Sequence, residues 1–493
     1  MNYGLLFRTV RHLKPTQVFY QVKNHLIKPA YRLLETTYVP EAALKTEPLP
    51  KYPSCDGRVF SFLNLEHEFS GWDYTGNGML WAYNQNYFDW INQSGFSETE
   101  GCKWIDSFIT DLPGNKVGLD PYPIALRSMN WVKFFCRYPN TATRERLDSL
   151  YSQLRLLERK LEYHLLGNHL LEDAYALFFG ASYFNDVRLK SKATRLLKEQ
   201  LKEQILPDGA HFEQSPMYHC ILLERLLDCI NIANSEICKD LKIVAVKMLG
   251  HLGSMVWADG SIPMLNDSAN GVAPIPEQLF DFARRLGLTW KAVPLQECGY
   301  RRLVGEHQEA FVDVGNVTAS YQPGHTHADT FNYELRIDGK PFIVDTGIST
   351  YNKNERRQLE RSTKAHNTVS VDGKDSSQVW GGFRVGRRAC IRNVRCVEEN
   401  GRSEVEASHN GFGRPCYRRF EMSGKSFTVE DKYEGDAVSY IHLAEGADET
   451  RIIIEGAERI ESNPWRYSTE YNQFHDGKVL ELHFNGTLRY IIR

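Results

Sequence analysis

The stretch Ser320-Tyr-Gln-Pro-Gly-His-Thr-His-Ala-Asp-Thr-Phe-Asn-Tyr-Glu-Leu-Arg-Ile337 joins a histidine pair to the start of an alternating strand. Side chains at positions i and i+2 of a regular strand share a face, so His325 and His327 could converge on one site. Pro323 and Gly324 leave another outcome open, because irregular backbone before the strand can turn the first histidine away from the second. One histidine could then transfer protons while the other holds a metal.

The chain changes character near residue 300. Upstream, apolar residues recur at helical spacing in 147–166, 191–205 and 217–232. Downstream, the apolar runs are short and alternating, over 331–337, 342–344, 368–371 and 480–484. Asp-Gly pairs stand at turn positions 338–339 and 372–373. We predict a multidomain α + β protein with a helical domain over 1–300 and an antiparallel β domain over 301–493. The boundary is expected between Pro276 and Glu306.

Composition limits the class of protein and of partner. With 493 residues, 42% hydrophobic and 25% charged, the chain is long enough for two or more globular domains. The net charge of -3 and the lack of a basic stripe argue against a nucleic-acid partner. Ten dispersed cysteines without a CxxC pair favour free thiols in a reducing compartment. No signal-peptide core or membrane-spanning apolar run is visible, so the expected location is the cytoplasm or the cytoplasmic membrane surface.

Residues 1–34 are basic and carry apolar residues at helical spacing. Their basic residues are Arg8, Arg11, Lys14, Lys23, Lys28 and Arg32, and the first acidic residue is Glu35. This segment is either an amphipathic helix on an anionic membrane surface or a first helix packed on its own domain. The shortness of the apolar stripe and its bounding prolines favour the packed helix.

Two motifs in the helical half carry chemistry. Asn168, His169 and Glu172 bring an amide, an imidazole and a carboxylate together, with the last two on one helix face. A hydrogen-bonded helix start explains Asn168 and His169 equally well. Tyr218 follows a proline at an expected helix start, where a tyrosine is more often a core or rim residue.

Three residues of the β half form a candidate metal site. His327, Asp345 and His366 lie on successive strand regions, and zinc or manganese accepts this combination of ligands. Their spacing alone does not establish a metal.

The order of these motifs resembles the heparinase II/III family of polysaccharide lyases. The resemblance rests on segments spread over most of the chain, which are 127–131, 168–172, 212–218, 265–268, 324–329, 345–347, 361–369 and 380–387. It implies an incomplete α/α toroid followed by an antiparallel β-sheet (β-sandwich) domain, with the site in the cleft between them. This architecture agrees with the two halves read from the sequence patterns.

The resemblance also implies a reaction, β-elimination on uronic-acid-containing polysaccharides. Removal of the C5 proton of a uronate requires neutralisation of its carboxylate, a base at C5 and an acid at the O4 leaving group. By resemblance, Asn168 with His169 neutralises the carboxylate, Tyr218 acts as base and acid, and His325 is a second proton-transfer group. The metal residues resemble a site, most readily filled by zinc, that braces the β domain in some members. Candidate substrate contacts are Arg127, Asn130, Glu172, Trp380 and Arg384, although ordinary salt-bridge or core roles suit them nearly as well.

Two other functions remain open from the sequence. A glycoside hydrolase on the same fold needs an acid and base carboxylate pair, for which the candidates are Glu172, Asp173, Glu213 and Asp267. A non-catalytic glycan-binding or biosynthetic-complex protein is the other alternative, and the presence of Asn168, Tyr218 and His325 argues against it. Because no export signal is visible, we expect a bacterial protein of surface-polysaccharide production that acts on an acidic polysaccharide or a glycan intermediate.

Overall fold

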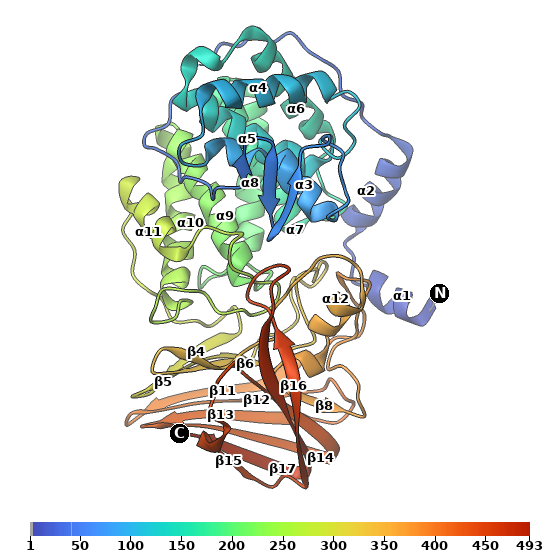
Figure 1. Cartoon of the computed structure of the whole chain (residues 1–493), viewed down its shortest axis with the longest axis vertical. Coiled ribbons are helices and arrows are strands. Elements are labelled where there is room, and N and C mark those ends of the chain that lie inside the picture. Colours follow the sequence, from blue (N-terminus) through green and yellow to red (C-terminus); the bar gives the residue numbers. More distant parts are fainter. Residues whose placement is uncertain (1–2, 41) are drawn as a thin grey trace.

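A helical domain is followed by a β domain, as the computed structural model shows for residues 3–40 and 42–493 (Figure 1). The helices of the first part are α1 (Tyr3–Val10), α2 (Pro15–Leu26), α3 (Met79–Tyr87), α4 (Glu98–Asp111), α5 (Pro121–Arg137), α6 (Arg144–Arg159), α7 (Gly167–Tyr183), α8 (Val187–Gln204), α9 (Pro216–Ile232), α10 (Ser235–Ser254) and α11 (Pro276–Arg285). The predicted fold class is confirmed. In the described residues, no helix is both long enough and apolar enough to span a bilayer.

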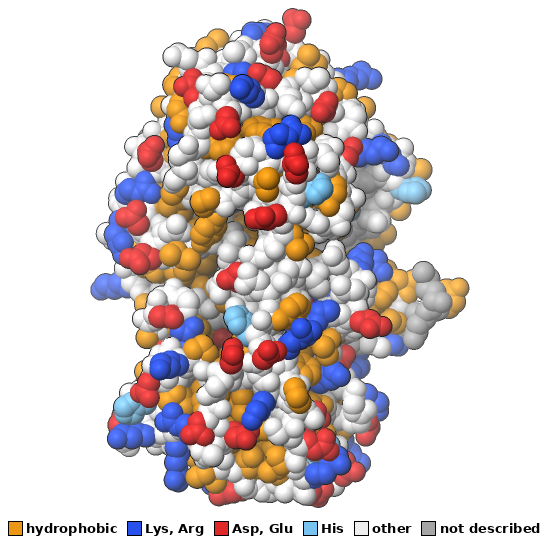
Figure 2. All heavy atoms as spheres, in the orientation of Figure 1, with side chains coloured by type: hydrophobic (Ala, Val, Ile, Leu, Met, Phe, Trp, Pro, Cys, Tyr) orange, Lys and Arg blue, Asp and Glu red, His pale blue; other side chains and the backbone are white. Residues whose placement is uncertain are grey.

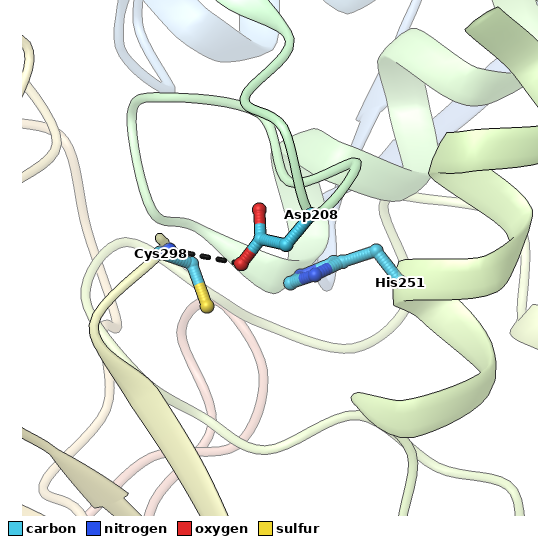
Figure 3. A group of neighbouring side chains, drawn as sticks. All are labelled: Asp208, His251 and Cys298. Carbon is cyan, nitrogen blue, oxygen red and sulfur yellow. Dashed lines mark hydrogen bonds between the residues drawn. The ribbon is translucent and has the colours of Figure 1, made fainter. Parts of the chain in front are cut away.

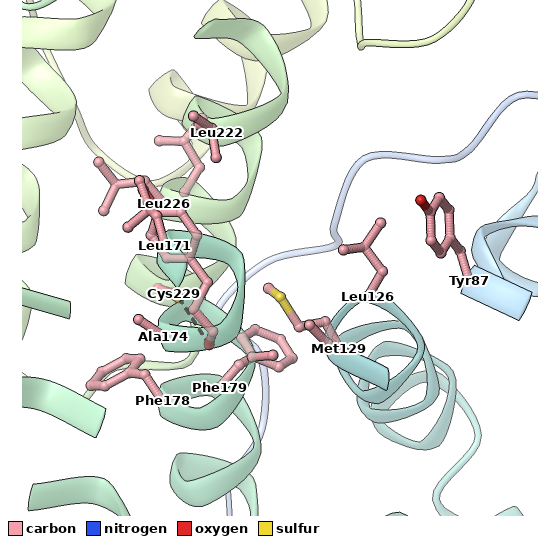
Figure 4. Close-up of a cluster of buried hydrophobic side chains, with 14 of the residues drawn as sticks. Tyr87, Leu126, Met129, Leu171, Ala174, Phe178, Phe179, Leu222, Leu226 and Cys229 are labelled. Atoms are coloured by element: carbon pink, nitrogen blue, oxygen red, sulfur yellow. Dashed lines mark hydrogen bonds between the residues drawn. The ribbon is translucent and has the colours of Figure 1, made fainter. Parts of the chain in front are cut away.

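The helical domain has an inner and an outer layer of helices. Nearly every described side chain of α7 and α9 is buried, whereas α8 buries one stripe, formed by Leu189, Ala193, Leu196, Leu197, Gln200, Leu201 and Gln204. These stripe positions recur every three or four residues, so α8 packs on α7 with one face and meets solvent with the other. In Figure 4, Leu171 and Ala174 of α7 lie towards Leu226 of α9, while Phe179 lies towards Met129 of α5. Such pairs of inner and outer helices are the units of an α/α toroid.

A small antiparallel sheet that was not predicted lies within the helical part. It consists of β1 (Cys55–Asp56), β2 (Val59–Phe62) and β3 (Leu65–Glu68), in that order. Phe60 of β2 is fully buried and makes edge contacts with Trp90 and Trp104 at ring distances of 5.0 and 5.3 Å. The sheet thus covers an aromatic cluster at the edge of the helical domain.

The β domain is one curled antiparallel sheet of twelve strands. Along its main path the order is β11-β12-β13-β14-β7-β6-β5-β4, and β17 joins β14 to β15 and β16, while β8 also pairs with β14. The bounds are β4 (Tyr300–Val304), β5 (Gln308–Asp313), β6 (Tyr333–Ile337), β7 (Lys340–Ile343), β8 (Val369–Val371), β11 (Ile391–Glu399), β12 (Arg402–His409), β13 (Cys416–Ser423), β14 (Ser426–Leu443), β15 (Ile452–Glu455), β16 (Arg459–Tyr467) and β17 (His475–Ile492). The register of β14 and β17 shifts between Tyr433 and Asp436, where the sheet bends around its own apolar core.

Two predicted turns have the backbone that their Asp-Gly pairs favour. Asp338 and Gly339 have φ values of 51° and 75° between β6 and β7, and Asp372 and Gly373 have φ values of 52° and 64° after β8. Positive φ at both central positions is the geometry of a type I′ turn. The short helix α12 (Glu355–Glu360) lies between β7 and β8, and the hairpin of β9 (Val379–Trp380) and β10 (Arg384–Val385) lies between β8 and β11.

The two domains are joined by residues 286–299, which run from α11 to β4. Asp208, in the loop after α8, accepts backbone hydrogen bonds from Gln296 at 3.1 Å and from Cys298 at 3.0 Å. Figure 3 shows this carboxylate between the Cys298 thiol and the imidazole of His251 on α10. Asp208 therefore fastens the connecting segment to the helical domain immediately before the β domain begins.

Candidate active site

A cleft of about 760 Å³ lies between the two domains. Its walls combine helical-domain residues, among them Tyr87, Tyr122, Asn168, His169 and Tyr218, with β-domain residues, among them His325, Tyr351, Phe383 and Tyr471. Three side chains predicted for catalysis from distant parts of the chain, Asn168, Tyr218 and His325, therefore share one cavity.

Asn168 stands in the first turn of α7 and is held by Glu213. The backbone N–H and the side-chain Nδ2 of Asn168 donate to the two carboxylate oxygens of Glu213, at 2.9 and 2.8 Å. The preceding Gly167 has a φ of +57°, and a Cβ there would lie 2.3 Å from Glu213 Oε1. Glycine is therefore needed for the close approach that fixes the amide. The same Nδ2 lies 3.3 Å from Nε2 of His325.

Tyr218 stands in the first turn of α9. Pro216 begins this helix, and the hydroxyl of Ser215 caps it by accepting from the Tyr218 N–H at 3.2 Å. The Tyr218 ring lies over the His325 ring with 4.0 Å between centroids, and its hydroxyl accepts from Tyr351 at 3.3 Å. Burial raises the pKa of the Tyr218 phenol, so the group is protonated at rest.

His325 is oriented by a carboxylate of the helical domain. Its Nδ1 donates to Oδ2 of Asp267 at 2.9 Å, and Nε2 of His327 donates to Oδ1 at 2.8 Å. Arg357 of α12 adds a bidentate pair to the same carboxylate, at 2.5 and 2.7 Å. Burial alone would raise the pKa of Asp267, but the Arg357 charge and the two histidine hydrogen bonds hold it well below its usual range. The ionised Asp267 keeps the proton of His325 on Nδ1, which leaves Nε2 towards Asn168 as a proton acceptor.

His169 also lines the cleft. It is 35% exposed, its Nδ1 lies 3.1 Å from Glu162, and its ring meets Tyr122 edge-on at 4.9 Å. Burial lowers the pKa of His169, but the Glu162 charge and hydrogen bond outweigh this effect and raise it. His169 can thus supply positive charge beside Asn168.

The opening histidine pair does not form part of a regular strand. The backbone of residues 322–332 is irregular, and β6 begins only at Tyr333. His325 and His327 approach the two oxygens of Asp267 instead of facing a common ion.

The predicted metal residues lie close together without converging. His366 Nδ1 donates to Oδ2 of Asp345 at 2.7 Å, Asn332 Nδ2 donates to the same oxygen at 2.6 Å, and the Gly347 N–H donates to Oδ1 at 2.7 Å. In the described part of the chain, ligand atoms of His327, Asp345 and His366 do not all fall within 4.8 Å of one another. As placed, this set does not fit a shared ion, because Asp345 orients His366 and His327 is bonded to Asp267.

Buried nitrogen and oxygen atoms without a hydrogen-bond partner nevertheless remain beside these residues. They are Nδ1 of His327, Nε2 of His366 and Oδ2 of Asp329, and the two imidazole centroids are 5.2 Å apart. Metal binding by His327, Asp345 and His366 stays a prediction, and no step of the reaction proposed for this cleft requires it.

The predicted substrate contacts are placed differently by the structure. Arg127 is fully buried and bonds Gln153 and two backbone carbonyl oxygens, while Asn130 is buried against the Tyr87 carbonyl and Asp89. Glu172 is fully buried, and Arg225 lies 3.6 Å from it. None of the three lines the cleft. The structure therefore places these three residues inside the helical domain and not in the cleft, where they were predicted to contact substrate.

Trp380 and Arg384 also lie outside the cleft lining. The indole N–H of Trp380 donates to Thr9 of α1 at 3.0 Å, and the Arg384 guanidinium lies 4.8 Å from the indole centroid. Phe383 of the same hairpin does line the cleft. Phe383 is therefore the residue of this motif that faces the cleft.

The carboxylates considered for hydrolysis do not form an open pair. Only Glu213 of the four lines the cleft, and it is bonded to Asn168. Asp173 accepts from the Glu162 N–H, and Asp267 is ion-paired with Arg357. This arrangement lacks the two facing carboxyl groups that hydrolysis of a glycosidic bond needs.

Sequence reasoning missed the contribution of Tyr351 and Arg357. Both follow β7, in a segment without a chemical motif, and their relation to Tyr218 and Asp267 arises only when the domains meet. Asp267 was recognised as part of a motif, but its contact with His325 was not foreseen.

Comparisons with known proteins place both domains. The family described as "Heparinase II/III N-terminus" matches residues 138–283, and "Heparinase II/III-like, C-terminal" matches residues 288–468. A heparin-sulfate lyase of Pedobacter heparinus is 28% identical over 265 residues, which are 47% of this chain and 40% of that protein. One from Bacteroides thetaiotaomicron is 22% identical over 333 residues, 56% of this chain and 46% of that protein. The matches thus span less than half the length of these curated relatives.

Solved structures share the fold along nearly the whole chain. A heparinase III structure has a TM-score of 0.66 at 16% identity and covers 98% of this chain and 92% of its own. A heparan sulfate lyase structure from Pedobacter heparinus has a TM-score of 0.57 at 16% identity, with 97% and 87% covered. At such identities the likeness establishes the architecture alone.

Proposed function

Because the chain belongs to the heparinase II/III family, we propose that it is a polysaccharide lyase that cleaves a uronic-acid-containing polysaccharide or glycan intermediate by β-elimination. The observation that carries the proposal is the meeting of Asn168, Tyr218 and His325 in one interdomain cleft. An amide, a phenol and an imidazole can supply the carboxylate contact, the acid and the base that elimination requires, and they come from three separate segments of the chain.

In the proposed reaction, a base removes the C5 proton of the uronate, and the electron pair delocalises into the carboxyl group as an enolate. The pair then forms the C4–C5 double bond as the C4–O4 bond breaks, and an acid protonates the departing O4. Asn168 and the cationic form of His169 stabilise the carboxylate while charge moves onto it. Substitution of Asn168 or His169 should leave the negative charge of the enolate less stabilised and raise the activation barrier to elimination.

The resting protonation states support a division of proton transfer. Tyr218 holds its proton because burial raises the pKa of its phenol, so it is ready to donate to O4. The Asp267 carboxylate accepts from Nδ1 of His325, so Nε2, on the side of Asn168, is the nitrogen that can accept the C5 proton. Tyr351 donates to the Tyr218 hydroxyl and so holds the phenol in position during proton transfer.

The charge of the cleft favours a sparsely charged substrate. Its lysine and arginine lining residues are Lys51, Arg225 and Lys353. Lys51 and Arg225 are already paired with Glu224, at 2.6 and 2.9 Å. A densely sulfated chain would meet Asp89, Glu213, Glu224 and Glu470 with few cations to balance it. We therefore propose a uronate glycan with little or no sulfate, bound largely through the aromatic walls.

The test is a screen of purified protein against unsulfated and sulfated uronate polysaccharides. Elimination creates a double bond conjugated with the carboxyl group, so product appears as ultraviolet absorbance, whereas hydrolysis yields none. Tyr218→Phe should lower turnover by roughly 100-fold or more, since it removes only the transferable proton. Tyr417→Phe, which removes a hydroxyl bonded to Glu406 in the β domain, is the matched control and should keep full activity. Cleavage without unsaturated product, or an active Tyr218→Phe enzyme, contradicts the proposal.

A further inference from the structure

The first two helices expose an unusual amount of apolar surface. Half of the exposed large hydrophobic side chains in the described chain lie within residues 3–39, less than a tenth of its length. We call the stripes on α1 and α2 the N-terminal apolar surface; its members are Tyr3, Phe7, Val10, Val18, Phe19, Val22 and Leu26. Figure 2 shows hydrophobic side chains on the protrusion at the side of the molecule where Figure 1 places α1.

Helix α2 contacts the protein with its polar face. Gln17 donates to the Leu165 carbonyl at 3.2 Å, Asn24 lies 3.2 Å from His164, and the Tyr20 ring stacks on Tyr163 at 4.6 Å. At 3.6 residues per turn, Val18, Phe19, Val22 and Leu26 fall within about 100° on the other side of the helix. Phe19 is 63% exposed and Leu26 is 75% exposed. The apolar stripe thus points to solvent, opposite to what a helix packed on its own domain shows.

Helix α1 repeats this arrangement. Arg8 and Thr9 bond Gln378 and Trp380, each at 3.0 Å, and these contacts fix the helix against the hairpin of β9 and β10. Tyr3, Phe7 and Val10 fall within about 60° of helix circumference on another side. Phe7 is 69% exposed, and α1 has no buried residue. Both helices are therefore anchored by polar contacts and leave their apolar stripes uncovered.

The charge around this surface has one sign. Residues 1–34 contain no acidic residue, and Arg11, Lys23, Lys28 and Arg32 form no ion pair among the described residues. The Arg388 guanidinium lies near Arg11 and adds to the local positive charge. Apolar side chains bordered by uncompensated cations match the interface of a bilayer that contains anionic lipid.

We propose that the N-terminal apolar surface docks this protein on an anionic membrane surface. Apolar side chains of α1 and α2 enter the boundary between headgroups and acyl chains, and the neighbouring cations contact lipid phosphates. A second copy of the chain is a poorer occupant, because pairing the two surfaces would bring their cations together without opposing charge.

Docking in this way sets the cleft beside the bilayer. The segment on which α2 rests includes Leu165, which lines the cleft. Lys14, at the start of α2, lies 4.0 Å from the ring centre of Tyr321, and the next residue, Gln322, also lines the cleft. If the proposed lyase function holds, the substrate is a glycan attached to the membrane at one end; membrane docking itself does not depend on that function.

Co-sedimentation with vesicles tests the docking without any substrate. The intact chain should pellet with phosphatidylcholine vesicles containing phosphatidylglycerol, should bind pure phosphatidylcholine much more weakly, and should lose binding as salt rises. The variant Phe19→Glu/Val22→Glu should lower binding by roughly 10-fold or more, because it removes apolar contact and adds repulsion. Ile243→Glu/Val304→Glu is the matched control, since both residues are exposed and lie outside α1 and α2.

Three results would overturn the proposal: no binding to the anionic vesicles, equal binding by Phe19→Glu/Val22→Glu, or a dimer in light scattering that this variant converts to monomer. The last result would assign the surface to a second copy. Circular dichroism of each variant controls for folding. Elimination of a soluble uronate polysaccharide by the vesicle-defective variant should equal that of the intact chain, so failure of docking and failure of the lyase proposal are measured separately.

Discussion

Asp267→Asn removes one charge from the centre of the proposed site while conserving side-chain shape. Asp267 is fully buried and accepts hydrogen bonds from His325, His327 and both terminal nitrogens of Arg357. An asparagine can accept at one position only and leaves the Arg357 guanidinium without its counter-charge. Loss of one partner of a buried ion pair costs about 3–5 kcal/mol, so we expect a fall of that size in the free energy of unfolding.

The same substitution should impair catalysis beyond its effect on stability. Without a carboxylate at Nδ1, His325 no longer favours the tautomer whose Nε2 accepts a proton, and loss of this control in a comparable histidine–aspartate pair costs on the order of 10⁴-fold in turnover. We expect a decrease of about 10³-fold or more, measured as unsaturated product under conditions where the variant is still folded. Urea unfolding gives the stability change.

The pH dependence of stability provides a signed test of the ion pair. Because the folded-state pKa of Asp267 is held well below its usual range, its contribution is fully present above the unfolded pKa of about 4 and is lost as pH falls further. The variant should therefore lose less stability than the intact protein on acidification below about pH 4. Asp281→Asn, which breaks an exposed pair with Arg285, serves as control and should cost less than about 1 kcal/mol. Equal stability and turnover in Asp267→Asn and the intact protein would refute the role given to this carboxylate.

Further substitutions test the neighbouring contacts. Gly167→Ala places a Cβ against Glu213 at a positive φ, so it should destabilise the fold by about 1–3 kcal/mol, measured by urea unfolding, and lower turnover in the absorbance assay. Unchanged turnover would show that Glu213 does not position Asn168 for the reaction. Tyr351→Phe removes the donor to the Tyr218 hydroxyl and should lower kcat by roughly 10-fold with little change in KM; an unchanged kcat would leave Tyr351 a wall residue. Elemental analysis of protein prepared without chelator tests the predicted metal. One zinc per chain, lost in His366→Ala, would show that His327, Asp345 and His366 rearrange from their present hydrogen bonds to hold an ion, whereas zinc-free protein of full stability would show that these residues are structural.

The fold followed from local patterns because each pattern has a local physical cause. The helical period of residues 217–232 and the turn preference of Asp338-Gly339 do not depend on the rest of the chain, and α9 and the β6–β7 turn match them closely. The helical spacing of apolar residues over 147–166 extends beyond the observed helix, because α6 ends at Arg159. The sheet of β1, β2 and β3 escaped notice because strands of two to four residues carry too little alternation to be recognised.

Site residues were harder to assign, because an isolated side chain does not reveal its partners. Arg127 was a candidate contact for a sugar or carboxylate, with a core role nearly as well suited, and the structure gives it the core role, because the carbonyl oxygens of Asn86 and Gly118 accept its hydrogen bonds in the interior. Arg357 shows the converse. Its importance arises from Asp267, ninety residues away in sequence, and no spacing rule connects the two.

The Arg357–Asp267 pair also bears on how the protein becomes competent during synthesis. Asp267 belongs to the part of the chain that leaves the ribosome first, whereas His325, His327 and Arg357 follow with the second domain. A chain that ends before the β domain lacks His325 and Arg357, the two partners that Asp267 contacts across the cleft. Completion of the chain and assembly of the proposed catalytic site are thus one event, so a truncated translation product should show no lyase activity.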